Sequence, residues 1–252
     1  MKGNISLKNK TFLKLSIFLI VSSLIVCALA YALGALYIPS PSVTTNAPES
    51  APQFKTVIID AGHGGEDGGA SSASGLVEKD VNLDISNTLC QMLRASGVNV
   101  VMTREEDKLL YDRNVDYRGR KKKLDLAARL AIADTTPDAI FVSIHMNSFT
   151  DPKYSGMQVW YSPNHALSST LAENIRSQNQ ALLQPNNKRK TTCATSAINI
   201  LYNAKCPAVL VECGFLSNKT DSERFSTDEY RQKTAFVLFC SIMDFLNAQN
   251  EK

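Results

Sequence analysis

Two of the three histidines in this 252-residue chain lie just beyond apolar runs that are typical of buried β-strands. His63 follows Val57-Ile58-Ile59 within a glycine-rich segment, and His145 directly follows the run from Ala139 to Ile144. In α/β sheets, ligands bind beyond the carboxyl ends of the strands, and imidazole is a common metal ligand. We therefore predict a metal site that these two histidines share. For His63 alone, a tight turn with an incidental histidine is the alternative interpretation.

Two glutamates are placed to complete such a site. Glu212 ends the strongly apolar run from Ala208 to Val211, and Glu78 precedes a helical pattern that begins at Val81. A carboxylate near a helix start is favoured by the helix dipole, so helix capping is the alternative for Glu78. Two histidines and one carboxylate leave zinc an open position, and a further glutamate can act as general base and then general acid. The spacing does not decide which glutamate has which role.

The elements that would position these residues alternate between strands and helices. Strands are predicted at 57–59, 98–103, 139–144, 156–162, 198–202 and 208–211, and helices at 81–93, 124–133, 167–183 and 228–246. A crossover from strand through helix to parallel strand brings the helix start beside the end of the first strand, which places Glu78 near His63. The predicted fold is a three-layer α/β/α arrangement around a central, mostly parallel, twisted sheet, preceded by an N-terminal membrane helix.

That membrane helix is predicted from the N-terminal residues. Residues 15–38 form an uncharged run of 24 residues, which exceeds the roughly 20 residues needed to cross a bilayer. All four nearby lysines precede the run, so residues 1–14 are expected in the cytoplasm and residues 39 onward outside it. A cleaved signal peptide, with Ala28 and Ala30 near its end, is the alternative, and the protein would then be secreted.

The rest of the chain divides into a linker and one domain. Residues 39–53 are rich in proline, serine and threonine and predict an extended linker, whereas residues 54–252 have the length of one domain with its own core. Four of the 27 basic residues are the N-terminal lysines, so the rest of the chain carries 23 basic and 24 acidic residues. This nearly neutral net charge argues against nucleic-acid binding through bulk electrostatics. The basic cluster at 118–123 is interpreted as a solvated loop, with docking onto an anionic extracellular polymer as the alternative.

The third histidine and the cysteines do not indicate a second site. His165 lies at the entry of a predicted helix, where turn and cap chemistry is the simpler interpretation. No two cysteines form a CxxC pair, which argues against a thiolate zinc site and against a dithiol redox motif.

Several short motifs surround the four candidate residues. They are Asp60-Ala61-Gly62-His63-Gly64-Gly65, Glu78-Lys79-Asp80, Met102-Thr103-Arg104, Ser143-Ile144-His145-Met146-Asn147 and Val211-Glu212-Cys213-Gly214-Phe215-Leu216-Ser217-Asn218. In content and order this set resembles the zinc-dependent N-acetylmuramoyl-L-alanine amidase family, type 3. The resemblance runs from about Thr56 to about Leu246, and in size and layout the chain is similar to the family's single-domain spore-cortex and cell-wall amidases.

The resemblance implies a function and a role for each site residue. It implies that His63, Glu78 and His145 bind one Zn²⁺ ion per chain and that Glu212 is the catalytic carboxylate. The substrate would be peptidoglycan, cut at the amide between the lactyl group of muramic acid and L-alanine of the stem peptide.

The same resemblance leads us to expect that Asn147, beside the second histidine, and Arg129, on the preceding helix, steady ligands or substrate. The competing enzyme hypothesis is a zinc carboxypeptidase or other peptidase acting on wall peptides, because the same metal and carboxylate can cut a peptide bond. A hypothesis of another class is a non-catalytic wall-binding module with a relic site, against which the presence of all four site residues argues. The need for an activator protein and a role in sporulation stay open at this point.

Overall fold

The structure, a computed structural model, describes residues 54–112 and 114–250. The predicted membrane segment at 15–38 and the predicted linker at 39–53 lie outside these residues. Within the described ranges, no helix is both long enough and apolar enough to span a membrane.

The described residues contain one six-stranded sheet. Its strands are β1 (Thr56–Ala61), β2 (Asn99–Met102), β3 (Ala139–Asn147), β4 (Gln158–Tyr161), β5 (Thr192–Cys193) and β6 (Ala208–Phe215). Their order across the sheet is β2-β1-β3-β6-β4-β5, and the β4–β6 pair alone is antiparallel. The prediction of a mostly parallel sheet is therefore confirmed.

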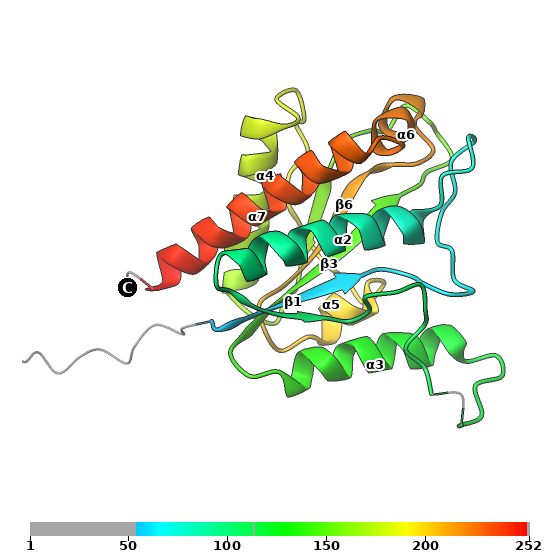
Figure 1. The fold of residues 1–252 in the computed structure, drawn as a ribbon, viewed down its shortest axis with the longest axis vertical. Helices are drawn as coiled ribbons and strands as arrows, with labels where there is room; N and C mark the ends of the chain where they lie inside the picture. The colour runs from blue at the N-terminus through cyan, green and yellow to red at the C-terminus, as the bar shows by residue number, and fades with distance from the viewer. Residues whose placement is uncertain (1–53, 113, 251–252) are drawn as a thin grey trace, which may run out of the picture. The chain divides into compact units, whose positions relative to one another are not determined.

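Helices cover both faces of this sheet (Figure 1). They are α2 (Glu78–Ala95), α3 (Lys121–Thr135), α4 (Leu167–Leu182), α5 (Asn199–Asn203), α6 (Lys219–Phe225) and α7 (Asp228–Asn250). Helix α7 packs against both α2 and α4 on one face, and α3 packs against α5 on the other. The domain thus has the three layers that the alternating sequence pattern predicts.

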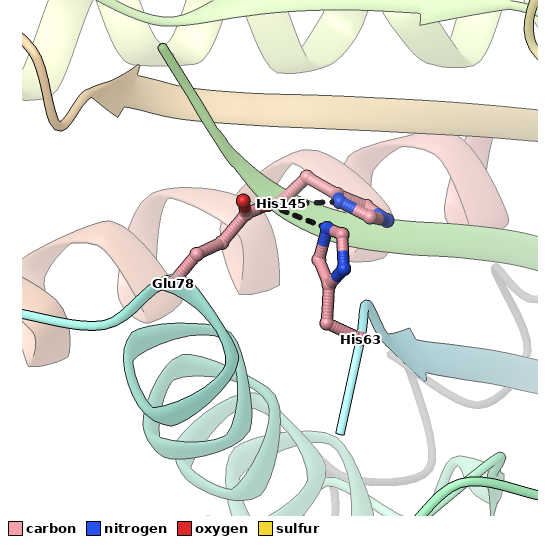
Figure 2. A group of neighbouring side chains, drawn as sticks. All are labelled: His63, Glu78 and His145. Carbon is pink, nitrogen blue, oxygen red and sulfur yellow. Dashed lines mark hydrogen bonds and ion pairs between the residues drawn. The ribbon is translucent and has the colours of Figure 1, made fainter. Parts of the chain in front are cut away.

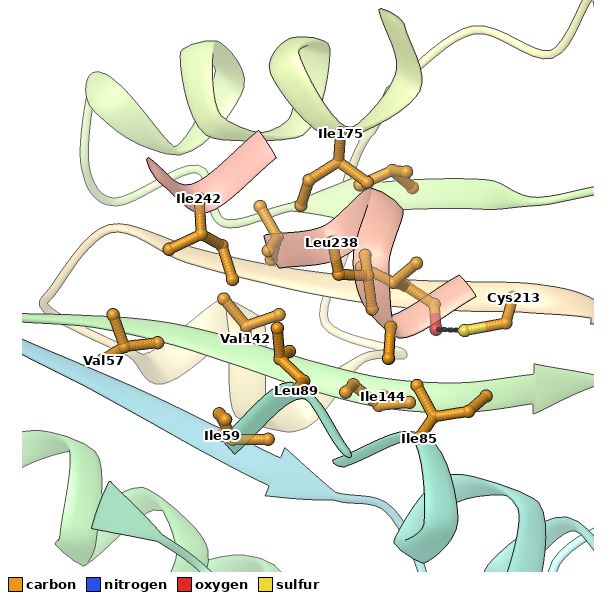
Figure 3. Packing of buried hydrophobic residues seen from close by; sticks show 14 of the residues in the cluster. Val57, Ile59, Ile85, Leu89, Val142, Ile144, Ile175, Cys213, Leu238 and Ile242 are labelled. Atoms are coloured by element: carbon orange, nitrogen blue, oxygen red, sulfur yellow. Dashed lines mark hydrogen bonds between the residues drawn. The ribbon is translucent and has the colours of Figure 1, made fainter. Parts of the chain in front are cut away.

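The central strands are apolar on both sides because helices cover both faces of the sheet. Val57 and Ile59 of β1 belong to the apolar cluster under α2, α4 and α7, whereas Ile58 between them belongs to the cluster under α3 and α5. All three side chains are fully buried. Figure 3 shows the first cluster, in which Ile85 and Leu89 of α2 pack onto the sheet. The packing on both faces fixes where β1 ends and where the following loop begins.

One predicted strand is wrong. Residues 198–202 fall mostly in helix α5, and the neighbours Ile200 and Leu201 are both buried. A helix lying on the sheet can bury two adjacent side chains, and a five-residue apolar run does not separate that case from a buried strand. The sheet instead gains the two-residue edge strand β5. The pattern also does not predict α6, which Asn218 caps by accepting the N–H of Asp221 at 3.0 Å.

Strands β3 and β6 extend further than their apolar runs predict. β3 continues to Asn147 and β6 to Phe215, so His145 and Glu212 lie within the strands rather than at their ends. The two residues are register partners, and the register shifts between His145 and Asn147. Such an irregularity can re-aim side chains beside a functional site. The strand pairing therefore sets His145 directly beside Glu212.

Candidate metal centre

His63, Glu78 and His145 come together at one edge of the sheet, from the loop after β1, the start of α2 and the end of β3 (Figure 2). Glu78 Oε1 lies 3.2 Å from His63 Nε2 and 3.0 Å from His145 Nδ1. One candidate ligand atom from each residue can be chosen so that all three lie within 4.8 Å of one another. The structure thus brings together His63 and His145, which the strand-end argument pairs, and Glu78, which the crossover argument places near His63.

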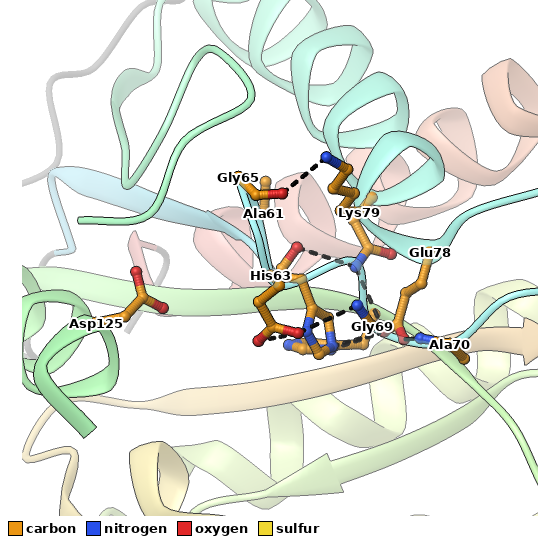
Figure 4. Close-up of polar contacts among 12 residues, drawn as sticks. Ala61, His63, Gly65, Gly69, Ala70, Glu78, Lys79 and Asp125 are labelled. Atoms are coloured by element: carbon orange, nitrogen blue, oxygen red, sulfur yellow. Dashed lines mark hydrogen bonds and ion pairs between the residues drawn. The ribbon is translucent and has the colours of Figure 1, made fainter. Parts of the chain in front are cut away.

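Backbone groups from two segments hold Glu78 toward the histidines. Its Oε2 accepts the N–H of Ala70 at 2.8 Å (Figure 4). Its Oε1 accepts the N–H of Met146 at 3.0 Å. Among the described residues, the Glu78 carboxylate accepts no backbone N–H of α2, so helix capping does not explain its position. Burial raises the pKa of Glu78, but the two imidazoles lower it more, and the net pKa lies well below the ordinary value. The carboxylate is therefore ionised and oriented.

His63 has an unusual backbone conformation within the glycine-rich loop. Its φ is +62°, in the left-handed region, which costs a non-glycine residue on the order of 1 kcal/mol. Arg129 Nη2 donates to the His63 carbonyl at 2.7 Å, and Asp67 Oδ2 lies 3.0 Å from Nδ1 of the ring. Burial lowers the pKa of His63, but Glu78 and Asp67 raise it more, so the net pKa is raised. Arg129 thus fixes the loop backbone at His63, and Asp67 lies within ion-pair distance of the ring nitrogen opposite the one that faces Glu78.

Two buried arginines hold the backbone where β1 ends. Arg104 donates from Nε to the Ala61 carbonyl at 2.8 Å and from Nη2 to the Gly62 carbonyl at 2.9 Å. Arg129 Nη1 donates to the same Ala61 carbonyl at 2.8 Å and to Asp60 at 2.6 Å. Burial raises the pKa of Asp60, but Arg129 lowers it more, so the net pKa is lowered. The two guanidinium groups satisfy carbonyls that buried backbone cannot leave unpaired.

The glycines let the loop backbone approach the ligand side chains closely. A Cβ at Gly62 would overlap the imidazole of His145, and a Cβ at Gly69 would lie 2.5 Å from Glu78 Oε2. Gly69 also has a φ of +68°, which glycine adopts without strain. Glycine is therefore required at these positions for the ligand geometry itself.

Glu212 reaches the same site from β6. It is the register partner of His145, and its Oε2 is enclosed without a hydrogen-bond partner among the described residues. Burial raises the pKa of Glu212 to about 7, since the attraction of His145 is opposed by the repulsion of Glu78. A carboxyl group with a pKa near neutrality can take up and release a proton at physiological pH.

The donor set fits a zinc ion. Two imidazole nitrogens and one carboxylate oxygen are ligands that Zn²⁺ accepts, and three protein ligands leave a position open for reaction. Glu212, whose Oε2 is enclosed and unpartnered among the described residues, is the strand neighbour of the ligand candidate His145. Across the described ranges, no other group of three such side chains could hold a metal ion.

Three further residues named from the sequence lie in different places. Arg129 contacts the loop backbone and two buried carboxylates rather than the ligand side chains. The Asn147 carbonyl accepts the N–H of Leu216 at 2.8 Å, which joins the ends of β3 and β6. His165 Nδ1 accepts the N–H of Leu167 at 3.2 Å at the entry of α4, as its position in the sequence predicts.

The basic cluster at 118–123 is partly helical rather than a loop throughout. Helix α3 begins at Lys121, and Lys121 Nζ pairs with Glu66 of the glycine-rich loop at 2.5 Å. Arg120 pairs with Asp116 at 3.5 Å. The start of α3 therefore braces the rim of the candidate site.

The sequence analysis gives no role to Arg104 or Asp67, although both hold the site. Each carries a signal that could have been used. Arg104 directly follows a predicted strand, where a charge is costly to bury without partners. Asp67 follows His63 by four residues, and histidine ligands commonly pair their second nitrogen with a carboxylate.

Comparison with known proteins identifies the family of the chain. The sequence matches the N-acetylmuramoyl-L-alanine amidase family over residues 57–242. It is 30% identical over 197 residues to the germination-specific N-acetylmuramoyl-L-alanine amidase of Bacillus subtilis, a match that covers 78% of this chain and 82% of that protein.

Two solved structures have a similar fold. The CwlD amidase from Clostridioides difficile, in complex with the GerS lipoprotein, has a TM-score of 0.73 and 34% identity, covering 77% of this chain and 99% of that chain. The amidase AmiC2 of Nostoc punctiforme has a TM-score of 0.65 and 30% identity, covering 79% of this chain and 99% of that chain.

Proposed function

This chain belongs to the N-acetylmuramoyl-L-alanine amidase family, and we propose that it hydrolyses peptidoglycan with a zinc ion held by His63, Glu78 and His145. The bond that it cuts is the amide between the lactyl group of muramic acid and L-alanine. The observation that carries the proposal is the convergence of three ligand side chains beside the unpartnered carboxylate of Glu212. When bound, Zn²⁺ supplies Lewis-acid polarisation of the scissile carbonyl and lowers the pKa of an attacking water.

Glu212 performs the proton transfers. Its carboxylate accepts a proton from the attacking water, and its Oε2 has no competing hydrogen bond among the described residues. The same carboxyl then gives that proton to the nitrogen of the departing L-alanine. A pKa of about 7 suits both directions, since the group changes protonation state at little cost near neutral pH.

The remaining loop contacts keep the ligands in place before substrate binds. Arg104 and Arg129 hold the carbonyls of residues 61–63, and Asp67 pairs with the ring of His63 at 3.0 Å. A site held within a fraction of an ångström loses little energy to reorganisation during the reaction.

The test uses the purified chain with metal analysis and product mass spectrometry. With Zn²⁺ it should release free amino termini from peptidoglycan, and a chelator should abolish the release. Glu212→Gln should keep bound metal and lose turnover by about 10²–10⁴-fold, the usual worth of a general acid–base group. Glu105→Gln is the matched control, because Glu105 is exposed and pairs with Arg94. Normal turnover by Glu212→Gln would refute the role given to Glu212.

Product masses separate the amidase from the competing carboxypeptidase. Amidase action frees an intact stem peptide from the glycan, whereas carboxypeptidase action shortens a stem that stays joined to muramic acid. Family membership and the match to solved amidases support the first outcome.

We extend the proposal to the protein's location and partner. Action outside the cytoplasm is supported by the cell-wall amidases among its relatives. Anchoring through residues 15–38 would be tested by cell fractionation, in which deletion of residues 1–38 should release the enzyme from membranes. The lipoprotein complex of the C. difficile amidase supports a protein partner, and the germination-specific relative supports a role in sporulation. Cortex muropeptides that are unchanged in spores lacking the gene would contradict the sporulation role.

A further inference from the structure

The loop between α4 and β5 carries three consecutive cations, Lys188, Arg189 and Lys190, and we name residues 188–190 the cationic loop. Lys188 and Arg189 line two adjoining open hollows of about 520 and 530 Å³. Arg224 adds further positive charge to the first of these, which Lys153 also lines although it pairs with Asp151 at 2.7 Å. Positive charge is thus concentrated here, in a domain whose net charge is close to neutral.

The acidic residues that line these hollows are already occupied. Asp221 Oδ2 accepts the N–H groups of Gly156 at 2.7 Å and Phe215 at 3.0 Å. Glu173 pairs with Arg176 at 2.5 Å. Within the described ranges, none of the three cations of the cationic loop forms an ion pair, so their charge remains available for an anion.

The cationic loop is held in position by ordered contacts. Arg189 Nε donates to the Ser155 carbonyl at 2.9 Å and Arg189 Nη1 to Gln158 Oε1 at 3.3 Å. Gln158 Nε2 in turn donates to the Lys190 carbonyl at 2.7 Å. The guanidinium carbon of Arg189 also lies 4.7 Å from the centre of the Phe215 ring. A guanidinium fixed in this way can bind a carboxylate with less loss of side-chain entropy.

Strand pairing connects the cationic loop to the candidate catalytic residue. Gln158 is the register partner of Glu212, which is the register partner of His145, so the three residues form one row across β4, β6 and β3. Neighbouring strands lie about 4.8 Å apart, which places the loop contacts of Gln158 on the order of 10 Å from the metal ligands. Two to three extended residues of a peptide span that distance.

From this placement we propose that the cationic loop binds the free carboxylates of the stem peptide, and so directs the peptide across β6 and β4. The inference rests on the proposed function. If Glu212 protonates the departing amine, the nitrogen of L-alanine must lie at Glu212, and the peptide continues from that nitrogen. The row His145, Glu212 and Gln158 leads from the cleaved bond to Arg189. Uncharged sugars offer these cations no partner, whereas stem residues beyond L-alanine offer carboxylates that arginine and lysine bind through charge-assisted hydrogen bonds.

The test compares two muropeptides that differ only in whether the stem carboxylates are free or amidated. The full-length chain purified in mild detergent is compared with a Lys188→Gln/Arg189→Gln double variant. We expect the double variant to raise KM for the free-acid substrate about tenfold at low salt, with kcat within twofold. For the amidated substrate the two proteins should have the same KM, and 0.5 M salt should remove most of the difference for the free acid, because salt screens exposed charges.

Two variants act as controls. Lys205→Gln removes one exposed lysine that precedes β6, at the far end of that strand from Glu212, and should leave KM unchanged. Arg189→Lys keeps the charge but loses the planar fork and should give an intermediate KM. An equal rise in KM for both substrates, or no rise for either, would overturn the inference.

A binding measurement separates this inference from the proposed function. Calorimetry of a free stem tripeptide should show binding to Glu212→Gln, and at least tenfold weaker binding once Lys188→Gln and Arg189→Gln are added. If the parent chain lacks turnover but this loss is seen, the function fails and the acidic-peptide site stands. If turnover is normal but the affinity for the tripeptide is the same with and without the two substitutions, the inference is wrong and the proposed function stands. The same holds if a phosphate polymer binds while the tripeptide does not.

Discussion

Glu212→Gln should make the metal-free protein more stable and should lower the turnover of the zinc-loaded protein. One carboxylate oxygen of Glu212, Oε2, is enclosed and unpartnered, and the pKa of the group is raised from 4.5 to about 7. A carboxyl whose pKa is higher in the folded than in the unfolded state contributes most favourably to stability at low pH, where it is protonated in both of these states. Its contribution becomes unfavourable as pH rises from the unfolded pKa through the folded pKa. A glutamine at this position does not ionise, so it avoids that pH-dependent cost.

The size of the effect follows from the two pKa values. Each pKa unit corresponds to about 1.36 kcal/mol, so the rise from 4.5 to about 7 costs at most about 3.4 kcal/mol once both states are ionised. At pH 5 the same values give about 1 kcal/mol. Glu212 keeps some contact with solvent, and the unpartnered glutamine amide offsets part of the gain at every pH. We therefore expect the free energy of unfolding of the variant, relative to the parent, to rise by about 2 kcal/mol between pH 5 and pH 8.

Urea unfolding with a chelator present measures this difference. Trp160 of β4 is the single tryptophan of the chain and reports on the sheet that carries Glu212. Glu105→Gln is the control and should shift stability by less than about 0.5 kcal/mol, because exposed ion pairs contribute little. A stability difference that stays constant from pH 5 to pH 8, or a parent that is the more stable protein at pH 8, would show that Glu212 is not the strained carboxyl described above.

Three further substitutions test the parts that hold the site. Arg129→Met should lower the free energy of unfolding in urea by about 3–5 kcal/mol, because it leaves Asp60 buried without its cation. The loss should be smaller at pH 4.5 than at pH 7.5, since protonation of Asp60 removes the unpaired charge. Equal losses at the two pH values would contradict the pairing. The exposed Arg94→Met is its control. Gly69→Ala should lower zinc affinity at least tenfold, because the added Cβ displaces the Glu78 carboxylate. Gly75→Ala is its control, since Gly75 has a φ of +86° and open space around it. That variant should lose only about 1 kcal/mol of stability and bind zinc as the parent does. Asp67→Asn should weaken zinc binding by about 10–100-fold with little change in the urea midpoint, and unchanged affinity would mean that Asp67 does not hold the ring of His63.

The fold could be predicted from the sequence where both periodicity and length were clear. β1 and β3 are buried on both faces and appear as largely apolar runs, and α2 and α4 have one apolar face each. Residues 198–202 were ambiguous because five apolar-rich residues do not distinguish a short helix from a strand. The two-residue strand β5 has no pattern of its own, since its position depends on pairing with β4.

The candidate site was predictable to the extent that it depends on strand order. Parallel strands joined by helices bring their carboxyl ends to one edge, so His63 and His145 converge whatever the details of the loops. Their immediate supports were not predictable in the same way. Arg104 reaches the carbonyls of residues 61–62 only because β2 lies beside β1, and a side-chain-to-backbone contact across 43 positions leaves no local sequence pattern.

The residues of the site that lower the stability of the domain lie close to the residues that hold the site in place. His63 is held in a left-handed conformation, and Glu212 is enclosed without a partner; each lowers the stability of the domain. The packed clusters on both faces of the sheet offset these costs, and Arg129 ties the His63 carbonyl to the buried Asp60 of β1. A substitution that relieves Glu212 should therefore stabilise the fold and remove the proton acceptor, whereas one that removes Arg129 should weaken both the fold and the ligand geometry. Stability and activity should thus change in opposite directions at Glu212 and in the same direction at Arg129, which a purely structural cluster of polar residues would not produce.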